Sequence, residues 1–185
     1  MSSTLTNRAH GSRTECDAGG MVSLSPMRLE DAVAHLAGED AELVRWLSGG
    51  PGTLPGVEAY IRRTIAQWAA GGPKLAFGIR TGEGLAGTID VDLALPGLQP
   101  GEANLAYGLY PAFRGRGIAT RAVQLACRYL CDRGDVDRAV IRTHPDNVAS
   151  AAVAERAGFV PAPARRAGDG TVFRVHVLDI GEAAP

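Results

Sequence analysis

A turn rich in glycine and arginine constrains this chain more than any other segment, because it stands where a predicted strand passes into a predicted helix. It reads YPAFRGRGIATR over residues 110–121. The first backbone N–H groups of a helix have no partner inside the helix, and the helix dipole makes that end positive. Glycine lacks the Cβ atom that would hold a ligand away from the backbone. The segment therefore predicts a binding site for a diphosphate group.

Two other nucleotide-binding turns rely on the same physics, and the spacing disfavours both. A P-loop needs a G-K-[ST] sequence, which the segment lacks, and a Rossmann turn needs a third glycine after Gly115 and Gly117. A solvated loop that merely caps a helix is the remaining alternative. We expect Arg114 and Arg116 to add positive charge and paired N–H donors for the diphosphate.

The composition fits one soluble domain. The chain has 185 residues, of which 45% are hydrophobic and 21% charged. No stretch approaches the roughly 18 apolar residues of a membrane span, and no secretory signal is recognisable, so we expect a cytoplasmic protein without a membrane partner. A formal net charge of −1 provides no broad positive field, which argues against nucleic acid as a partner.

The three cysteines do not indicate a metal site. Cys16 lies in a polar N-terminal segment, and Cys127 and Cys131 are four residues apart on a predicted helix, which is not the C-x-x-C spacing of zinc ligands. We expect buried, unreactive thiols and no bound metal.

The order of the predicted elements describes an α+β layered domain with a mixed central sheet. Residues 1–20 are polar and without hydrophobic period, so we expect a disordered tail before a single domain over residues 21–185. The second helix is expected to bury Tyr60, Ile61, Ile65 and Trp68. Hydrophobic spacing predicts strands over residues 21–28, 74–80, 85–95, 102–110, 138–143, 159–163 and 171–180, and helices over residues 29–38, 56–70, 118–130 and 147–157.

Two motifs resemble those of GNAT acetyltransferases. The turn is similar to their coenzyme A motif R-x-x-G-x-G/A, and a later stretch resembles the N-x-x-S…G-F helix of the subgroup that includes ribosomal-protein alanine acetyltransferases and some antibiotic acetyltransferases. The resemblance is strong over residues 105–180 and weaker over residues 21–100. It implies a mixed central sheet flanked by helices on both faces, and acetyl-CoA as the co-substrate for acylation of an amine. The matching residues are Arg114, Gly115, Arg116, Gly117, Ile118 and Ala119, followed by Asn147, Ser150, Ala157, Gly158 and Phe159.

The resemblance also implies where coenzyme A binds. The strand before the turn is expected to diverge from the strand after the next helix, with the pantetheine arm in the opening. Backbone groups of Leu109 and Tyr110 would then pair with the arm, and an N–H near Tyr107 would face the thioester oxygen. The other expected contacts are Arg114, Gly115, Arg116, Gly117, Ile118, Ala119, Thr120, Asn147 and Ser150. Asn147 is equally well explained as a helix N-cap, and Ser150 as a surface hydroxyl.

Catalysis calls for a general base, because a lysine-like amine is mostly protonated at neutral pH. Asp90 and Asp92 alternate with apolar residues and should share one face of a strand, while Glu102 begins the next strand. We expect Asp92, or else Glu102, to be the base, and a solvent-facing role remains open for each carboxylate. The glutamate that the subgroup often has on this second strand corresponds to Asn104.

The departing thiolate needs a proton. The tyrosine that many members of the family use corresponds here to Ala154, so the resemblance passes this role to Ser150 or to a bound water.

The acceptor is the least predictable part. The resemblance places it between residues 29–72 and 160–173, where Trp46, Tyr60 and Trp68 could wall a pocket, although aromatic residues at helical spacing more often belong to the core. We expect a protein N-terminus or a small-molecule or antibiotic amine. An acyl-CoA-binding module without turnover is an alternative, as is transfer of a longer acyl group such as succinyl. The residues that could hold the succinyl carboxylate are Arg142, Arg165 and Arg166. A homodimer is compatible with the sequence, which does not determine the oligomeric state.

Overall fold

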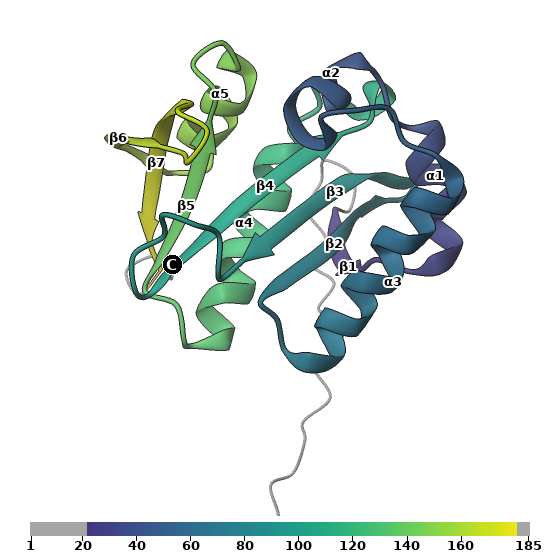
Figure 1. Ribbon diagram of the computed structural model, residues 1–185, viewed down its shortest axis with the longest axis horizontal. Helices are drawn as coiled ribbons and strands as arrows, with labels where there is room; N and C mark the ends of the chain where they lie inside the picture. Colours follow the sequence, from purple (N-terminus) through teal and green to yellow (C-terminus); the bar gives the residue numbers. More distant parts are fainter. Residues whose placement is uncertain (1–21, 181–185) are drawn as a thin grey trace, which may run out of the picture.

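Seven strands form one mixed sheet in the order β1-β2-β3-β4-β5-β7-β6 in the computed structural model, which describes residues 22–180 (Figure 1). Neighbouring strands are antiparallel except β4 and β5, which run parallel and are connected through helix α4. The strands are β1 Ser23–Pro26, β2 Lys74–Thr81, β3 Gly84–Asp92, β4 Glu102–Leu109, β5 Arg138–Thr143, β6 Val160–Arg166 and β7 Val172–Asp179. All seven predicted strands are therefore confirmed.

Helices cover both faces of the sheet, as the predicted fold class requires (Figure 1). Alternation along the strands separates two hydrophobic cores, one packed against α4 and a smaller one packed against α3. The helices are η1 Leu29–Asp31, α1 Ala32–Ala37, α2 Ala41–Leu43, η2 Val44–Ser48, α3 Leu54–Ala70, η3 Pro111–Phe113, α4 Ile118–Arg133 and α5 Val148–Arg156. Within residues 22–180, no helix is both long and apolar enough to cross a membrane.

Helix α3 buries a different stripe from the predicted one. Thr53 caps its start by accepting the Gly56 N–H, and Gly71 ends it in the left-handed conformation. The buried residues are Val57, Ile61 and Thr64. Ile65 is 43% exposed, so its assignment to the core was wrong. Ile61 is buried as predicted, and Thr64 takes the buried position beside Ile65, where its hydroxyl donates to the Ile61 carbonyl at 2.8 Å.

Two further predictions need correction. The segment that holds α2 and η2 was not predicted, because two very short helical turns give too little periodicity to detect. Cys127 is buried as expected, but Cys131 is exposed, since it lies one residue past Leu130 and outside the buried stripe of α4. The predicted tail and Cys16 lie outside the described residues.

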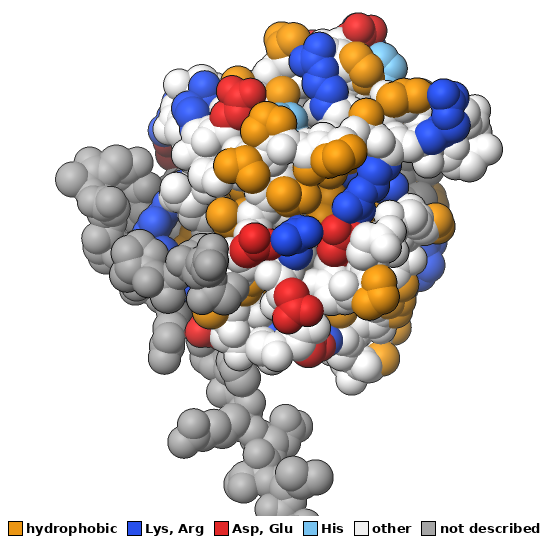
Figure 2. Space-filling view, turned by 90° about the vertical axis from the view of Figure 1, so that its left-hand side faces the viewer, with side chains coloured by type: hydrophobic (Ala, Val, Ile, Leu, Met, Phe, Trp, Pro, Cys, Tyr) orange, Lys and Arg blue, Asp and Glu red, His pale blue; other side chains and the backbone are white. Residues whose placement is uncertain are grey.

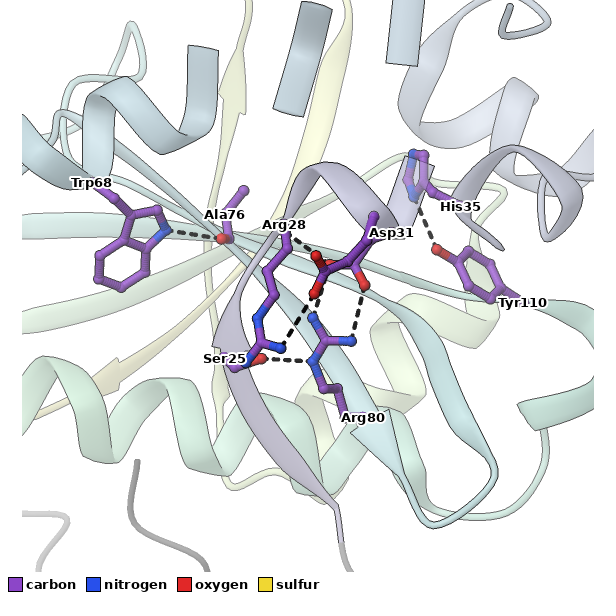
Figure 3. A network of polar contacts seen from close by, with 9 residues as sticks. Ser25, Arg28, Asp31, His35, Trp68, Ala76, Arg80 and Tyr110 are labelled. Carbon is purple, nitrogen blue, oxygen red and sulfur yellow. Dashed lines mark hydrogen bonds and ion pairs between the residues drawn. The ribbon is translucent and has the colours of Figure 1, made fainter. Parts of the chain in front are cut away.

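A buried ion pair fastens the first strand and the first helical turn to the sheet (Figure 3). Asp31 is 7% exposed and accepts two hydrogen bonds from the Arg80 guanidinium, at 3.0 and 2.8 Å. The Arg28 N–H also donates to Asp31, and Arg80 Nε donates to Ser25 Oγ. Because both charged groups are largely withdrawn from water, removing one of them would leave the other buried without a counter-ion and destabilise the fold.

Replacing Asp31 with Asn keeps the shape of the side chain but leaves the Arg80 guanidinium without a counter-ion. We expect the free energy of unfolding, measured with urea, to fall by about 3 kcal/mol. Glu58→Gln is the matched control, because Glu58 pairs with Arg62 on the surface of α3 at 3.0 Å. It should cost less than about 0.5 kcal/mol. Equal losses in the two variants would contradict the assignment.

The effect of Asp31→Asn should depend on pH. Burial alone would raise the pKa of Asp31, but the hydrogen bonds from Arg80 and from the Arg28 N–H outweigh burial and lower it. A carboxyl with a lowered folded pKa adds stability above its unfolded pKa and loses it as the pH falls through the folded value. The difference between the two proteins should therefore be complete at neutral pH and shrink below about pH 4.

Candidate functional site

The two parallel strands at the centre of the sheet separate soon after they pair. β4 pairs with β5 from Glu102 to Asn104, and beyond that point β4 runs toward α2 while β5 runs toward α5 (Figure 1). β3 stays paired with β4 as far as Leu109. Backbone N–H groups of an antiparallel strand alternate between its two sides. The Tyr110 N–H donates to the Ala86 carbonyl of β3 at 2.9 Å, so it points toward β3. The N–H groups of Leu109 and Tyr107 therefore point to the other side of β4, toward the opening.

One of the two residues expected to pair with the pantetheine arm, Tyr110, already has partners for its backbone groups. The Tyr110 N–H donates to the Ala86 carbonyl, and the Tyr110 carbonyl accepts the Phe113 N–H at 3.0 Å. Both groups are therefore used inside the protein. Its side chain also lies elsewhere, since the hydroxyl bonds to His35 Nδ1 at 2.9 Å (Figure 3). Leu109 remains a candidate through its N–H.

The glycine–arginine turn leaves the start of α4 open. Gly115 and Gly117 have φ values of 72° and 76°, and a Cβ atom built on either would meet no atom within 4 Å. The first backbone bond inside the helix runs from the Arg121 N–H to the Gly117 carbonyl, at 3.1 Å. The preceding N–H groups, those of Ile118, Ala119 and Thr120, therefore point out of the helix end. This arrangement matches the predicted diphosphate site in geometry.

The two arginines of the turn already have carboxylate partners. Arg114 forms a two-point pair with Asp40 at 2.7 and 2.8 Å, and its Nε donates to the Leu109 carbonyl at 3.0 Å. The Arg114 side chain therefore holds the turn against the cap of α2, and its contact with a diphosphate stays a prediction. Arg116 pairs with Glu83 on the surface, where such pairs contribute little and exchange readily. Arg116 accordingly remains a candidate contact.

Ser150 and Tyr107 link α5 to β4. The Asn147 side chain accepts the Ser150 N–H at 3.0 Å, which confirms Asn147 as the N-cap of α5. Ser150 Oγ donates to the Tyr107 hydroxyl at 3.1 Å, and that hydroxyl donates to the Ser150 carbonyl at 2.9 Å. Burial raises the pKa of Tyr107 to about 12, so the phenol keeps its proton at neutral pH.

The Tyr107 side chain was missed in the sequence, where only its backbone was considered. A usable signal existed, because alternation places Tyr107 on the same face as Leu105 and Leu109, whose side chains belong to the core packed against α4.

The other face of the sheet carries three carboxylates in different states. Asp90 is bound by Lys74 Nζ at 2.7 Å and by the Tyr60 hydroxyl at 3.2 Å. Asp92 lies two residues along the same face, and its Oδ1 accepts the Ala94 N–H at 3.0 Å. None of the ion pairs among residues 22–180 includes Asp92, although Arg142 interacts with it electrostatically without an ion pair between the two side chains. Of the two aspartates, only Asp92 thus keeps a carboxylate that no cation holds.

Glu102 has a structural task. Both its oxygens accept hydrogen bonds from Arg165, at 2.6 and 2.7 Å, and one also accepts the Gln99 N–H at 2.8 Å. The hydrogen bonds from Arg165 lower the pKa of Glu102 despite its burial. A carboxylate held in this way ties β6 to β4 and is a poor proton acceptor, so we withdraw Glu102 as a candidate base.

The segment over α2 and η2 spans the open end between β4 and β5. Leu43 and Leu47 rest where a Cβ atom on Gly108 would be, so β4 needs glycine there. On the other side, the Trp46 ring lies 5.4 Å from His144, and Arg45 reaches Asp146 at 3.9 Å. Trp46 therefore borders the opening.

Of the other two aromatic residues expected in an acceptor wall, Tyr60 lies over the face of the sheet that carries Asp90, to which its hydroxyl donates a hydrogen bond. Trp68 does not: its Nε1 donates to the Ala76 carbonyl and its ring packs on Phe77 and Tyr129, in the core.

Charged side chains are mixed by sign over the side of the molecule that carries β6 and β7. Figure 2 shows hydrophobic side chains gathered across its middle, with basic and acidic side chains interspersed around them. A surface of this kind has no single-sign field that would select a polyanion or a polycation.

Comparison with known proteins gives a family. A family model described as "Acetyltransferase (GNAT) domain" matches residues 22–160. A search of curated proteins gives no significant match.

Solved structures of acetyltransferases share the fold. Mycobacterium smegmatis RimJ in complex with CoA-disulfide has a TM-score of 0.77 at 20% identity, over 94% of this chain and 88% of that chain. The aminoglycoside acetyltransferase AAC(6')-Ib in complex with coenzyme A has a TM-score of 0.74 at 20% identity, over 85% of this chain and 94% of that chain. RimL, a ribosomal alpha-N-protein acetyltransferase in complex with coenzyme A, has a TM-score of 0.73 at 21% identity, over 85% and 93%. The predicted fold class is confirmed.

The pair between Arg114 and Asp40 can be tested by titration. The two-point hydrogen bond from Arg114 holds the pKa of Asp40 at about 2. In carbon-detected NMR between pH 3 and pH 5, the Asp40 carboxyl should stay ionised in the wild-type protein. In the Arg114→Gln variant it should titrate near its ordinary value of about 4. Glu83, whose pKa Arg116 lowers, serves as an internal control and should not change. An unshifted Asp40 midpoint in the variant would refute the pairing.

Proposed function

Because the chain belongs to the GNAT acetyltransferase family, we propose that it transfers an acetyl group from acetyl-CoA to a primary amine. One observation carries the proposal: the open first turn of α4 and the unpaired edge of β4 border the same divergence between β4 and β5. We assign this activity to one domain over residues 21–185, acting in the cytoplasm.

The backbone would provide most of the grip on coenzyme A. The N–H groups of Ile118, Ala119 and Thr120 have no partner inside the helix, so a diphosphate placed at the start of α4 would meet these donors and the positive end of the helix. The Leu109 N–H would hold the pantetheine arm, and the Tyr107 N–H would face the thioester oxygen as charge develops on it. Coenzyme A supplies the activated acyl group, and the chain's own residues position it and move protons.

Asp92 is the candidate general base. It lies on the sheet face opposite α4, which we call the acceptor face because we propose that the amine binds there. In the register of β3 and β4 it is directly across from Asn104, at the point where β4 and β5 separate. No cation of the described chain holds it, unlike Asp90 and Glu102. A neutral primary amine loses one of its two N–H protons when it becomes an amide. Asp92 accepts that proton directly or through water.

Ser150 and Tyr107 form the candidate path for the proton of the departing thiolate. Both hydroxyl hydrogens can rotate. Ser150 Oγ can turn its hydrogen toward the sulfur while Tyr107 turns its own from the Ser150 carbonyl toward Ser150 Oγ. This pair would replace the tyrosine of other family members, whose position is Ala154.

The acceptor is proposed to be either a protein N-terminus or a small amine of the aminoglycoside kind. The first is the substrate class in the name of RimL, and the second is that of AAC(6')-Ib. Both present a primary amine, which the acceptor face can receive between Asp92 and Trp46.

A longer acyl group remains a second candidate because of Arg142. Its guanidinium is half-buried and donates to the Pro96 carbonyl at 3.0 Å, and within residues 22–180 it forms no ion pair, although the Asp92 carboxylate interacts with it electrostatically. Arg165 and Arg166, the other arginines considered for this role, are held by Glu102 and by the Gly170 carbonyl. Arg142 could therefore bind the distal carboxylate of a succinyl group.

Release of free thiol tests the proposed function. Acetyl-CoA is mixed with the protein and with kanamycin or a peptide that begins with alanine, and the same peptide with a blocked N-terminus is the negative control. We expect acceptor-dependent thiol from at least one free amine, and faster release from acetyl-CoA than from succinyl-CoA. Asp92→Asn should lower kcat by about 100-fold, whereas Asp90→Asn, on the same strand and face, should lower it far less. No thiol release with any amine would leave only the binding module.

The diphosphate site is tested by a pair of glycines on one helix. Gly117 and Gly134 flank α4 with φ values of 76° and 74°, and neither has an atom within 4 Å of a built Cβ. Changing either to alanine should therefore cost the same backbone strain, about 1 kcal/mol. Only Gly117→Ala should weaken coenzyme A binding in calorimetry, by about tenfold or more. Similar affinities in the two variants would show that the cofactor does not bind at this turn.

A further inference from the structure

Asn104 is a buried side chain with an unpaired polar atom. It is 6% exposed, and its Oδ1 has no hydrogen-bond partner within residues 22–180. Buried carbonyl oxygens are nearly always paired, because an unpaired one loses its hydration without compensation. A leucine of similar size would fill the same space without that penalty. The oxygen therefore indicates a donor that arrives with a ligand.

The position of Asn104 shows which ligand it would meet. It is the last residue of β4 in register with β5, where it lies opposite Val140. On the other side it lies opposite Asp92 of β3. Its neighbours Ala103 and Leu105 belong to the core packed against α4, so Asn104 faces the opposite side, which it shares with Asp92. The amide thus stands beside the candidate base, at the point where the strands begin to separate.

The chemistry of an amide differs from that of the carboxylate beside it. An amide oxygen accepts a hydrogen bond but does not take up a proton at neutral pH, whereas a carboxylate does both. A neutral primary amine carries two N–H groups and one lone pair. One N–H can be held by Asn104 while the other delivers its proton to Asp92, which leaves the lone pair for the acyl carbon.

We propose that Asn104 binds the reacting amine of the acceptor through its Oδ1 and thereby selects amines over hydroxyl groups. The inference rests on the proposed function. In the step, the nitrogen forms a bond to the acyl carbon, the carbon–sulfur bond breaks, and Asp92 takes one N–H proton. The thiolate receives a proton from Ser150 Oγ, which takes one from the Tyr107 hydroxyl, and proton exchange with water then returns Tyr107 and Asp92 to their starting states. The amide product keeps one N–H, and this is the hydrogen that Asn104 holds throughout.

A hydroxyl acceptor cannot satisfy both residues. It has a single hydrogen, which must go to Asp92, so the Asn104 oxygen would stay buried and unpaired in the ester-forming reaction. Sites with an unpaired buried partner discriminate strongly against the substrate that lacks the matching group. The selectivity of the site for nitrogen would then come from Asn104, and the proton transfer from Asp92.

The test compares three variants of the full chain. Asn104→Leu removes the oxygen and keeps the volume, Asn104→Asp keeps an acceptor oxygen, and Thr143→Val removes another buried unpaired oxygen, on the face of the sheet that meets α5. The acceptor is whichever of kanamycin and the alanine-starting peptide turns over faster. The readouts are KM for the acceptor, KM for acetyl-CoA, and the urea midpoint of unfolding.

Asn104→Leu should raise the KM for the acceptor about tenfold, the value of one lost hydrogen bond, and leave the KM for acetyl-CoA unchanged. Its urea midpoint should equal or exceed that of the wild type, because an unpaired buried oxygen is gone. Asn104→Asp should recover acceptor affinity, and Thr143→Val should change the midpoint without changing the KM for the acceptor.

Two results would overturn the assignment. An unchanged acceptor KM in an active Asn104→Leu enzyme would show that Asn104 does not touch the amine, and a lower urea midpoint would show that its oxygen has a structural partner. These two results would leave the proposed function standing. The proposed function itself is refuted if the wild-type protein releases no thiol with any amine.

Discussion

The early end of the pairing between β4 and β5 is the constraint on which the rest of the site depends. Parallel strands that stayed paired would use their backbone groups on each other, and nothing would remain for a ligand. Because the register stops at Asn104 and Val140, the next residues of β4 keep one edge toward the opening. The start of α4 borders the same opening, so backbone donors from a strand and from a helix converge without any catalytic side chain.

Side chains then fix the walls of the opening and decide which groups stay reactive. Arg114 ties the turn to the cap of α2, Tyr107 ties β4 to α5, and Glu102 ties β4 to β6. In each tie the polar groups are used inside the protein. On the sheet face that carries Asp92, Arg165 forms an ion pair with Glu102 and Lys74 forms one with Asp90. Asp92 is the third carboxylate of this face and is in neither pair. A carboxylate of this site is thus available for proton transfer because no basic side chain forms an ion pair with it, not because its residue type is unusual.

The sequence was sufficient for the strands, the long helices and the glycine–arginine turn, and insufficient for the side-chain partners. Strands and long helices follow from local periodicity, and the turn is recognisable because its glycines and arginines are contiguous. The pairing of Arg114 with Asp40 spans 74 positions and that of Glu102 with Arg165 spans 63, so local sequence patterns could not show that these side chains already have partners. Such pairings depend on how strands are ordered in the sheet. α2 and η2 were missed because they are too short to show a period.

The backbone amides at the start of α4 are the proposed site for the diphosphate of coenzyme A. Two-dimensional amide NMR of the isotopically labelled chain, recorded while coenzyme A is added, tests it most directly. We expect the largest saturable shifts at the amides of residues 115–120, and no change at the amides of the far end of α4, near Gly134. Saturable shifts that leave residues 115–120 unaffected, or no shifts at all, would contradict it.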